Sequence, residues 1–243
     1  MLTMVSAVRP PRFSRYLLRT TDVEAAAAFY DAVLDHRGDG ILPLHESAIA
    51  RGARPHWLGH VQVGHGGAVD TMITRFVERG AMHLGPPPGV ADFAIFRDAG
   101  GAIVAVTGNA AESSSRVVWH QLSTLDPQRA AANYSALFGW SFAESEIDLG
   151  AFGRHRRFAF DAGESFIGQV SGIEGRPEVH AHWLFFFAVP SLDLAVDRVR
   201  TKEGTVLGPI EFSNGARVAV CEDPQGAAFG LIEAEDAVRL AEG

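Results

Sequence analysis

In the second half of the chain, hydrophobic and polar positions follow a strand pattern, with a period of two residues, in some segments and a helical pattern in others. Val117–Ser123 has the alternation and length of a short strand. Asp126 is a good helix N-cap, and Pro127 suits the first helical position, where a missing N–H costs little. The pattern therefore predicts a strand followed by a helix. The apolar face of this helix consists of Ala130, Tyr134, Leu137 and Phe138. Further strands, separated by glycine-containing turns, are predicted at Trp140–Ile147, Phe152–Asp161 and Ser165–Ser171.

The same order of elements then follows a second time. Trp183–Val189 is apolar at every position, which is typical of a strand covered on both faces. Pro190 and Ser191 begin a second helix, which ends at Gly204. Three more strands close the unit, at Thr205–Leu207, Arg217–Glu222 and Ala227–Ile232.

The whole pattern also occurs in the first half of the chain. Asp22 and Tyr30 recur, at one common spacing, as Asp126 and Tyr134. Further landmarks recur in the same order: His56-Trp57-Leu58 as His182-Trp183-Leu184, Gly85-Pro86 as Gly208-Pro209, and Asp98-Ala99-Gly100-Gly101-Ala102 as Asp223-Pro224-Gln225-Gly226-Ala227. Landmarks that recur in one order indicate an internal duplication.

The two copies differ in length at one place. Between the landmark tyrosine and the landmark tryptophan, the first copy is shorter by about 22 residues, roughly the size of a β-hairpin. A polar stretch, Gly108–Arg116, joins the copies. We therefore expect two tandem domains, a degenerate one at residues 14–108 that lacks one hairpin and a complete one at residues 116–233.

The composition narrows the class of protein. The chain has 243 residues, a formal net charge of −8 and 47% hydrophobic residues, which is typical of a globular protein and argues against nucleic acid as a partner. The longest apolar stretch, Trp183–Pro190, is far shorter than the ~20 residues of a membrane helix, and Met1–Pro11 lacks the apolar segment of a signal peptide. Cys221 is the single cysteine, so we expect no internal disulfide and no thiolate zinc site. We expect a cytoplasmic protein without nucleic-acid or membrane partners.

Three segments of the second copy carry a resemblance to a known family. These segments are Asp126–Trp140, Trp183–Val189 and Asp223–Ala227. Through them the chain resembles the glyoxalase / bleomycin-resistance / extradiol-dioxygenase superfamily, also called the vicinal oxygen chelate proteins, over nearly its whole length. The resemblance implies an α+β fold of paired βαβββ modules, in two tandem copies, whose curved sheets form cups for small molecules.

Most enzymes of the resembled family hold a divalent metal ion with His or Glu side chains from three strands. The resemblance assigns the ligand positions to Trp119, Leu184 and Gly230 in the second copy and to Arg15, Leu58 and Ala105 in the first. None of these side chains is a ligand for such a cation. We therefore expect no metal and no other cofactor.

The remaining histidines offer a weaker alternative for a metal. His56 and His60 lie four residues apart on a predicted strand, roughly 13 Å, which is too far for them to share one ion, and His65 follows close by. His180 and His182 are two residues apart and share one strand face. We expect this second pair to bind metal weakly or not at all.

Strand alternation identifies the side chains that face the cup of the second copy. Those expected to bind a ligand are Trp119, Gln121, His182, Leu184, Phe186 and Gly230. They make an aromatic, mostly neutral pocket with a few polar groups, which is typical of a small-molecule site. The alternative is that the aromatic residues simply fill the cup as core. His120 faces the opposite side and is interpreted as a buried structural histidine.

In the first copy, Arg15, Arg19 and His60 occupy the corresponding face. Two arginines beside a histidine would suit a carboxylate or a phosphate, because the guanidinium group is a fork-shaped donor. The alternative is that both arginines lie at the surface or in an interface.

The leading hypothesis is a glyoxalase- or bleomycin-resistance-like protein that binds a small, partly aromatic molecule in the cup of the second copy, without the family's metal. It would sequester this molecule, or convert it by acid–base chemistry through His182 or a hairpin Glu. The alternative is a metal-dependent glyoxalase or dioxygenase with displaced ligands. A third hypothesis gives the first copy a structural role, in completing the fold or in forming a homodimer interface. The residues do not decide between an enzyme and a binding protein.

Overall fold

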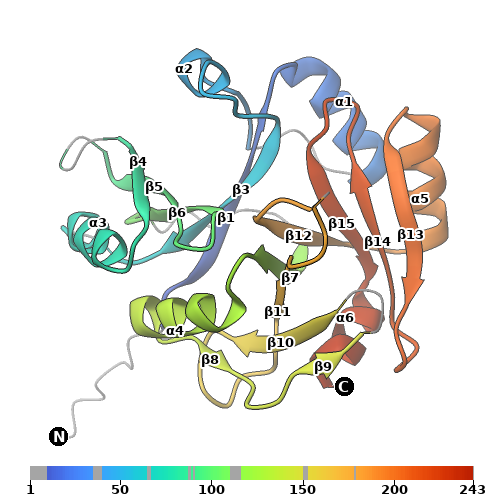
Figure 1. Cartoon of the computed structure of the whole chain (residues 1–243). Helices are drawn as coiled ribbons and strands as arrows, with labels where there is room; N and C mark the ends of the chain where they lie inside the picture. Colours follow the sequence, from blue (N-terminus) through green and yellow to red (C-terminus); the bar gives the residue numbers. More distant parts are fainter. Residues whose placement is uncertain are drawn as a thin grey trace, which may run out of the picture.

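Two β-sheets, each built by one half of the chain, form the body of the protein (Figure 1). The computed structural model describes residues 10–34, 40–64, 67–86, 89, 91–109, 116–149, 153–177 and 179–242. The elements of the first half are β1 (Arg12–Thr20), α1 (Val23–Leu34), β2 (Ile41–Pro43), α2 (Glu46–Ile49), β3 (His56–Gln62), α3 (Ala68–Glu78), β4 (Met82–Gly85), β5 (Phe93–Arg97) and β6 (Ile103–Thr107). Those of the second half are β7 (Val117–Thr124), α4 (Pro127–Phe138), β8 (Ser141–Phe142), β9 (Ile147–Asp148), β10 (Arg154–Ala159), β11 (Gly168–Gly172), β12 (His182–Val189), α5 (Leu192–Thr201), β13 (Thr205–Glu211), β14 (Arg217–Glu222), β15 (Ala228–Glu233) and α6 (Ala234–Glu242).

The second sheet extends further than the first on one side. The first sheet has the strand order β2-β1-β3-β6-β5-β4, and the second has the order β13-β14-β15-β12-β7-β11-β10-β8, with β9 paired to β10. Both contain a central antiparallel pair, β1 with β3 and β7 with β12. Beyond β1 the described residues add only the short parallel strand β2, whereas β11, β10 and β8 continue the sheet beyond β7. Two sheets with flanking helices confirm the α+β class predicted from the sequence.

Local sequence explains where helix α4 begins and ends. The side chain of Asp126 accepts a hydrogen bond from the backbone N–H of Arg129 (2.9 Å), and Pro127 occupies the first turn. Gly139 follows the helix with a φ of 77°, a left-handed conformation that favours glycine. The helix predicted to follow Asp126 is therefore confirmed.

The strands between α4 and β12 are shorter than the sequence predicts. The predicted strand over 140–147 forms only β8 and the start of β9, and the one over 165–171 begins at Gly168. Because β8 lies at the edge of its sheet, a single neighbour supplies its hydrogen bonds, and only two of its residues pair with β10. Phe152 and most of the predicted linker, Gly108–Arg116, lie outside the described residues.

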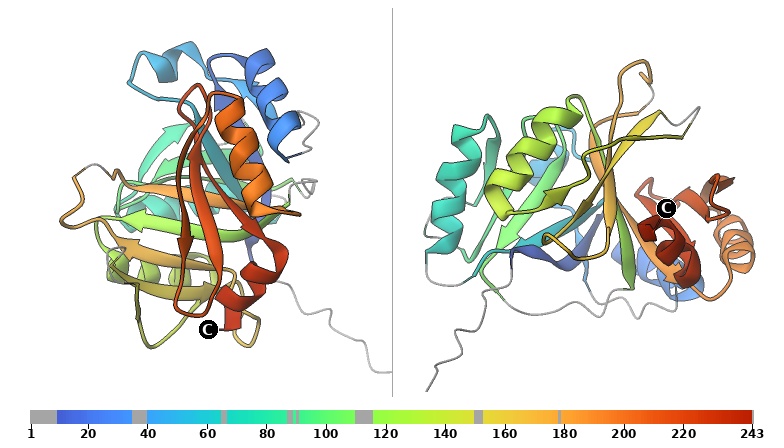
Figure 2. Two further views of the ribbon diagram at one scale, coloured as in Figure 1. Left: turned by 90° about the vertical axis from the view of Figure 1, so that its right-hand side faces the viewer. Right: turned by 90° about the horizontal axis from the view of Figure 1, so that it is seen from below.

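The main hydrophobic core lies between the two sheets. Phe13 of β1 stacks on the ring of His120 at 5.0 Å between centroids and meets Trp183 edge-on at 5.1 Å. Trp57 of β3 contacts Phe187 of β12 at 4.9 Å. Helices pair across the same seam, α1 with α5 and α3 with α4 (Figure 2). The two halves therefore share one core, and each sheet has an outer face that points away from it.

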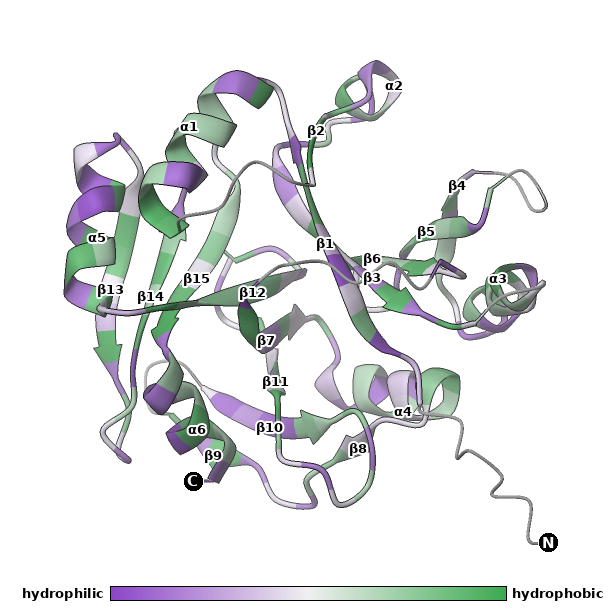
Figure 3. Ribbon diagram, turned by 180° about the vertical axis from the view of Figure 1, so that it is seen from behind, coloured by the Kyte–Doolittle hydropathy of each residue, from purple (hydrophilic) through white to green (hydrophobic). Residues whose placement is uncertain are grey.

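Helix α6 lies against the outer face of the second sheet, and the sequence pattern described above does not include it. Its apolar residues Ala237 and Leu240 are buried in one cluster with Trp119 and Phe186 of the sheet. Hydrophobic and hydrophilic residues alternate along this helix, so it covers the sheet with one side only (Figure 3). Across the described residues, no helix has the length and apolar character needed to cross a membrane.

Candidate ligand-binding site

The outer face of the second sheet brings together the side chains predicted to bind a ligand. Three rows of directly paired residues cross this face: Trp119, Phe186 and Gly230; Gln121 and Leu184; Ser123 and His182. All of the predicted positions therefore share one face of one sheet, because side chains alternate strictly along each strand. Their role in binding a ligand stays a prediction.

Strands β11 and β10 extend two of these rows with polar side chains. The row of Gln121 continues through Gln169 and Arg157, and the row of Ser123 continues through Ser171 and His155. These residues are not predictable from the sequence, because β11 pairs with β7 across a long connection whose register no local pattern reveals. The sequence of β11 does contain one indication, because the polar residues Gln169 and Ser171 alternate with Gly168 and Val170, which is typical of a strand with one polar face.

Several buried polar atoms on this face have no hydrogen-bond partner among the described residues. The Nε1 atom of Trp119 is one of them, although the side chain is only 1% exposed. Ser171 Oγ and two guanidinium nitrogens of Arg157 are likewise unpartnered. A buried polar group without a partner costs about 1–3 kcal/mol, so this cluster favours a bound molecule with hydrogen-bond acceptors.

The other tryptophans show that an unpartnered indole is unusual in this chain. Each of the remaining three donates its indole N–H to an oxygen. The pairs are Trp57 with the hydroxyl of Tyr30, Trp140 with the carbonyl of Pro11, and Trp183 with the hydroxyl of Tyr134, at 3.0, 2.7 and 3.2 Å. Trp119 therefore stands apart from a consistent pattern of satisfied donors.

Aromatic surface and positive charge lie next to these donors. The guanidinium of Arg157 stacks over the ring of Phe166 at 4.6 Å from the centroid, and burial lowers the pKa of Arg157. Phe166 packs against the same cluster as Trp119. Nε2 of Gln169 donates to Oε1 of Gln121 (3.2 Å), which fixes both amides on the face. The arrangement offers donors, one cation and flat apolar surfaces to a small molecule.

The part of this face that α6 covers is packed, and Trp119 belongs to the same cluster. Leu184 and Phe186 are 3% and 2% exposed, and they share a cluster with Leu240 of α6. These two side chains therefore form a covered floor rather than an open wall. The candidate site is the polar end, from Trp119 across Gln121 to β10.

His182 lies at the start of β12, at the edge of this region. Its Nδ1 is 2.7 Å from the carbonyl oxygen of His180, and the two imidazole rings are 4.9 Å apart. Burial lowers the pKa of His182, so its ring is neutral near pH 7. The pair offers two nitrogen atoms but no third ligand among the described residues.

The positions that the family resemblance assigns to metal ligands do not fit a metal in this chain. A Cβ atom added at Gly230 would lie 2.2 Å from Cδ1 of Phe186, so the phenyl ring occupies the space that an acidic side chain would need. Trp119 and Leu184 carry no atom that binds a divalent cation. In the described part of the chain, no group of three His, Cys, Asp or Glu side chains is placed to hold a metal.

In the first sheet, Arg15 and His60, two of the three residues predicted to bind an anion, are directly paired. Arg15 lies opposite His60, and Arg19 lies opposite His56, two rows further along β1. Leu58 is 2% exposed, in the row between them. His65, named above as a further histidine near this strand, lies outside the described residues.

Two further residues, His120 and Cys221, are buried and serve in packing rather than at a site. His120 points into the shared core, where its Nε2 is 2.6 Å from the hydroxyl of Tyr16 and its Nδ1 is 2.9 Å from the carbonyl of Ile167. Burial lowers its pKa to about 4, which confirms the interpretation as a buried, neutral histidine. Cys221 is 1% exposed, and burial raises its pKa to about 12, so it does not supply a thiolate.

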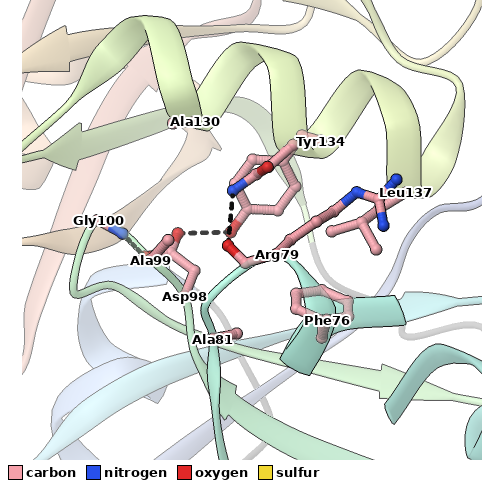
Figure 4. Close-up of a pocket in the computed structure, with 10 residues that line it drawn as sticks. Phe76, Arg79, Ala81, Asp98, Ala99, Gly100, Ala130, Tyr134 and Leu137 are labelled. Atoms are coloured by element: carbon pink, nitrogen blue, oxygen red, sulfur yellow. Dashed lines mark hydrogen bonds between the residues drawn. The ribbon is translucent and has the colours of Figure 1, made fainter. Parts of the chain in front are cut away.

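A small cavity at the seam between α3 and α4 is not a ligand site. Its volume of about 10 Å³ holds at most one water molecule. Figure 4 shows Tyr134 and Asp98 meeting there, with a hydrogen bond of 2.8 Å from the hydroxyl to the carboxylate. The cavity belongs to the packing of the two halves.

Comparison with known sequences identifies one family. A model of the Glyoxalase/Bleomycin resistance protein/Dioxygenase superfamily matches residues 12–231. The putative glyoxylase CFP32 of Mycobacterium tuberculosis (strain CDC 1551 / Oshkosh) is 31% identical over 118 residues. That match covers 48% of this chain and 44% of the relative, so the chain aligns with less than half of that protein.

Solved structures with the same architecture include a dioxygenase and a glyoxalase. The homoprotocatechuate 2,3-dioxygenase from Brevibacterium fuscum, in complex with 3,4-dihydroxyphenylacetate, has a TM-score of 0.62 at 14% identity, over 94% of this chain and 82% of that one. The Mn(II)-bound glyoxalase from Novosphingobium aromaticivorans has a TM-score of 0.59 at 12% identity, over 93% and 82%. At these identities the likeness shows the fold alone.

Proposed function

Because the chain belongs to the Glyoxalase/Bleomycin resistance protein/Dioxygenase superfamily, we propose that it binds a small, partly aromatic molecule on the outer face of its second sheet, without a metal. The observation that carries this proposal is the indole N–H of Trp119, which is buried and unpartnered beside further unpartnered polar atoms. A ligand that supplies an acceptor to these groups removes their desolvation cost.

The side chains of the site define the chemistry of the ligand. Its aromatic part lies against the half-buried ring of Phe166. Its polar part accepts hydrogen bonds from Trp119, Ser171 and the amide pair of Gln121 and Gln169. Because these groups are mostly donors and Arg157 is a cation, an aromatic carboxylate suits the site better than an amine.

We propose metal-free binding, and elemental analysis distinguishes it from the metal-dependent alternative. Protein purified without a His tag should contain no stoichiometric Mn, Fe or Zn by elemental analysis. One equivalent of any of these metals would contradict the proposal. Turnover of a bound compound through His182 would show as product formation, and it would be lost on His182→Ala exchange while binding persists.

The binding test uses the full chain with benzoate, benzamide and cyclohexanecarboxylate as probes. Thermal shift and isothermal titration should show benzoate binding more tightly than the other two, because only benzoate is both aromatic and anionic. A ligand that binds the native state alone raises the melting temperature. Equal effects of all three probes would contradict the proposed chemistry.

Variants locate the binding. Trp119→Phe keeps an aromatic ring but removes the donor, and it should weaken benzoate binding about tenfold. Arg157→Gln should remove the preference for benzoate over benzamide. Gln128→Leu changes an exposed residue of α4 and serves as the control, with unchanged affinity. Unchanged affinity in both site variants would overturn the proposal.

A further inference from the structure

A second cluster of polar side chains lies on the outer face of the first sheet. Arg15 on β1 is directly opposite His60 on β3, and Arg19 is directly opposite His56. Between these two rows lies an apolar pair, Leu17 and Leu58. Four residues along a strand span roughly 13 Å, so two extended arginine side chains can approach one another over this apolar pair.

The two arginines have no acidic counterpart. Neither guanidinium forms a hydrogen bond or an ion pair with any described residue. Arg19 is partly buried, and this burial lowers its pKa, which shows that the cation is partly removed from water. A partly desolvated guanidinium without a partner is unfavourable unless an anion arrives to pair with it.

His60 provides an independent sign of a binding site. Its side chain is 4% exposed, and its Nε2 has no hydrogen-bond partner among the described residues. Burial, together with the charges of Arg15 and Arg19, lowers the pKa of His60 to about 3. Arg15 is the direct cross-strand partner of this neutral imidazole, and Arg19 lies two rows away on the same face.

We propose that the outer face of the first sheet binds a small organic anion, whose carboxylate or phosphate is held by Arg15 and Arg19 beside His60. The apolar part of this anion lies against Leu17 and Phe93, both half-buried. The ring centroid of Phe93 is 6.3 Å from that of His60. The fork-shaped donors of arginine match both kinds of anion, and neutral His60 adds one further hydrogen bond. This site is independent of the one proposed on the second sheet, since no residue is shared.

The test titrates phenyl phosphate, benzoate and inorganic phosphate into the full chain by isothermal titration calorimetry at low ionic strength. Phenyl phosphate or benzoate should bind more tightly than inorganic phosphate, because only the organic probes use the apolar floor. The tighter of the two organic probes identifies the anionic group that the site prefers. Equal binding of inorganic phosphate and the organic probes would contradict the apolar part of the proposal.

Paired variants decide which residues hold the anion. Arg15→Gln and Arg19→Gln should each weaken the preferred probe about tenfold, and the double variant more than either. Arg51→Gln removes one exposed charge from the same half and should leave the affinity unchanged within about twofold. The decisive comparison uses a Trp119→Phe, Arg157→Gln background, in which the second-sheet site is removed. Binding that survives Arg15→Gln and Arg19→Gln together in this background, or an Arg51→Gln effect as large as theirs, would overturn the proposal.

A structural measurement keeps the proposal testable if the variants fold poorly. Crystals of the unaltered protein soaked with 4-bromobenzoate should show anomalous bromine density beside His60. Bromine density beside Trp119 alone would overturn the first-sheet site and support the second. Density at both places supports both proposals, and density at neither overturns the first-sheet site for carboxylates.

Discussion

The hydroxyl of Tyr30 donates a hydrogen bond of 3.1 Å to the carboxylate of Asp223, which comes from the other half of the chain. The same hydroxyl accepts the indole N–H of Trp57 (3.0 Å). Asp223 also accepts backbone N–H groups of Gln225 and Ala227 with its second oxygen, at 2.9 Å each. One buried hydroxyl therefore links a helix, a strand and a turn across the seam between the halves.

The duplicated residues repeat this link in the opposite direction. Tyr134 of the second half donates to Asp98 of the first (2.8 Å) and accepts from Trp183 (3.2 Å). Burial raises the pKa of both Asp98 and Asp223, although hydrogen bonds to each carboxylate act against the rise. The halves are thus joined by two equivalent networks, as expected when one unit has been duplicated.

Removing the hydroxyl should destabilise the protein. Tyr30→Phe leaves the ring in place but deprives Asp223 and Trp57 of a buried partner, so the free energy of unfolding should fall by about 1–3 kcal/mol. Urea denaturation at pH 7 measures the change. Tyr134→Phe should cost a similar amount, because its surroundings are equivalent. A loss below about 0.5 kcal/mol in both variants would show that the networks do not hold the halves together.

The repeat itself was legible in the sequence, but its contacts were not. The landmarks Tyr30, Trp57 and Asp98 recur in order with Tyr134, Trp183 and Asp223, which predicts two copies of one unit. Spacing along the chain does not say whether a tyrosine meets the aspartate of its own copy or of the other. That choice depends on how the two sheets pack, which is a property of the whole molecule.

The candidate site was predictable only where strand alternation governs it. Trp119, Gln121 and Leu184 share a face because side chains alternate along a strand whatever its neighbours are. Arg157 joins them through the pairing of β11 with β7, which depends on a connection that local pattern does not fix. The spacing of Ala237 and Leu240 carried a helical signal for α6, but not the information that this helix packs on the outer face of the second sheet beside the site.

Protonation of His120 should weaken the fold in acid. Its pKa is lowered by burial from 6.5 to about 4, so the unfolded chain binds this proton more readily than the folded one. Stability that is present above pH 6.5 is therefore lost as the pH falls from 6.5 towards 4. By this linkage the loss between pH 7 and pH 5 is about 2 kcal/mol.

The exchange His120→Phe isolates this contribution. The variant should be less stable at pH 7, because Tyr16 and the carbonyl of Ile167 lose their partner. Its stability should nevertheless fall less between pH 7 and pH 5 than that of the unaltered protein. Denaturation curves at both pH values give the comparison, and equal acid sensitivity in the two proteins would show that His120 does not titrate as described.

Helix α6 should contribute to stability through the side that faces the sheet. Leu240 is 9% exposed and packs in the cluster of Trp119 and Phe186, so Leu240→Ala should cost about 2 kcal/mol or more. Val238 on the same helix is 54% exposed, and Val238→Ala should change stability by less than about 0.5 kcal/mol. Chemical denaturation compares the two. Equal, small effects would mean that α6 is not bound to the sheet in solution.

The contact between Gly230 and Phe186 gives the strongest test of why the family's metal position is absent from this chain. A Cβ at Gly230 would lie 2.2 Å from the ring of Phe186, so Gly230→Ala should force the ring to move and cost about 1–3 kcal/mol. In a Phe186→Leu background the same exchange should cost clearly less, because the atom that clashes is gone. The difference between the two costs is the coupling energy of the pair, which a double-mutant cycle measures directly. Additive costs would mean that the ring of Phe186 does not occupy this space, and an acidic side chain at position 230 would then have room.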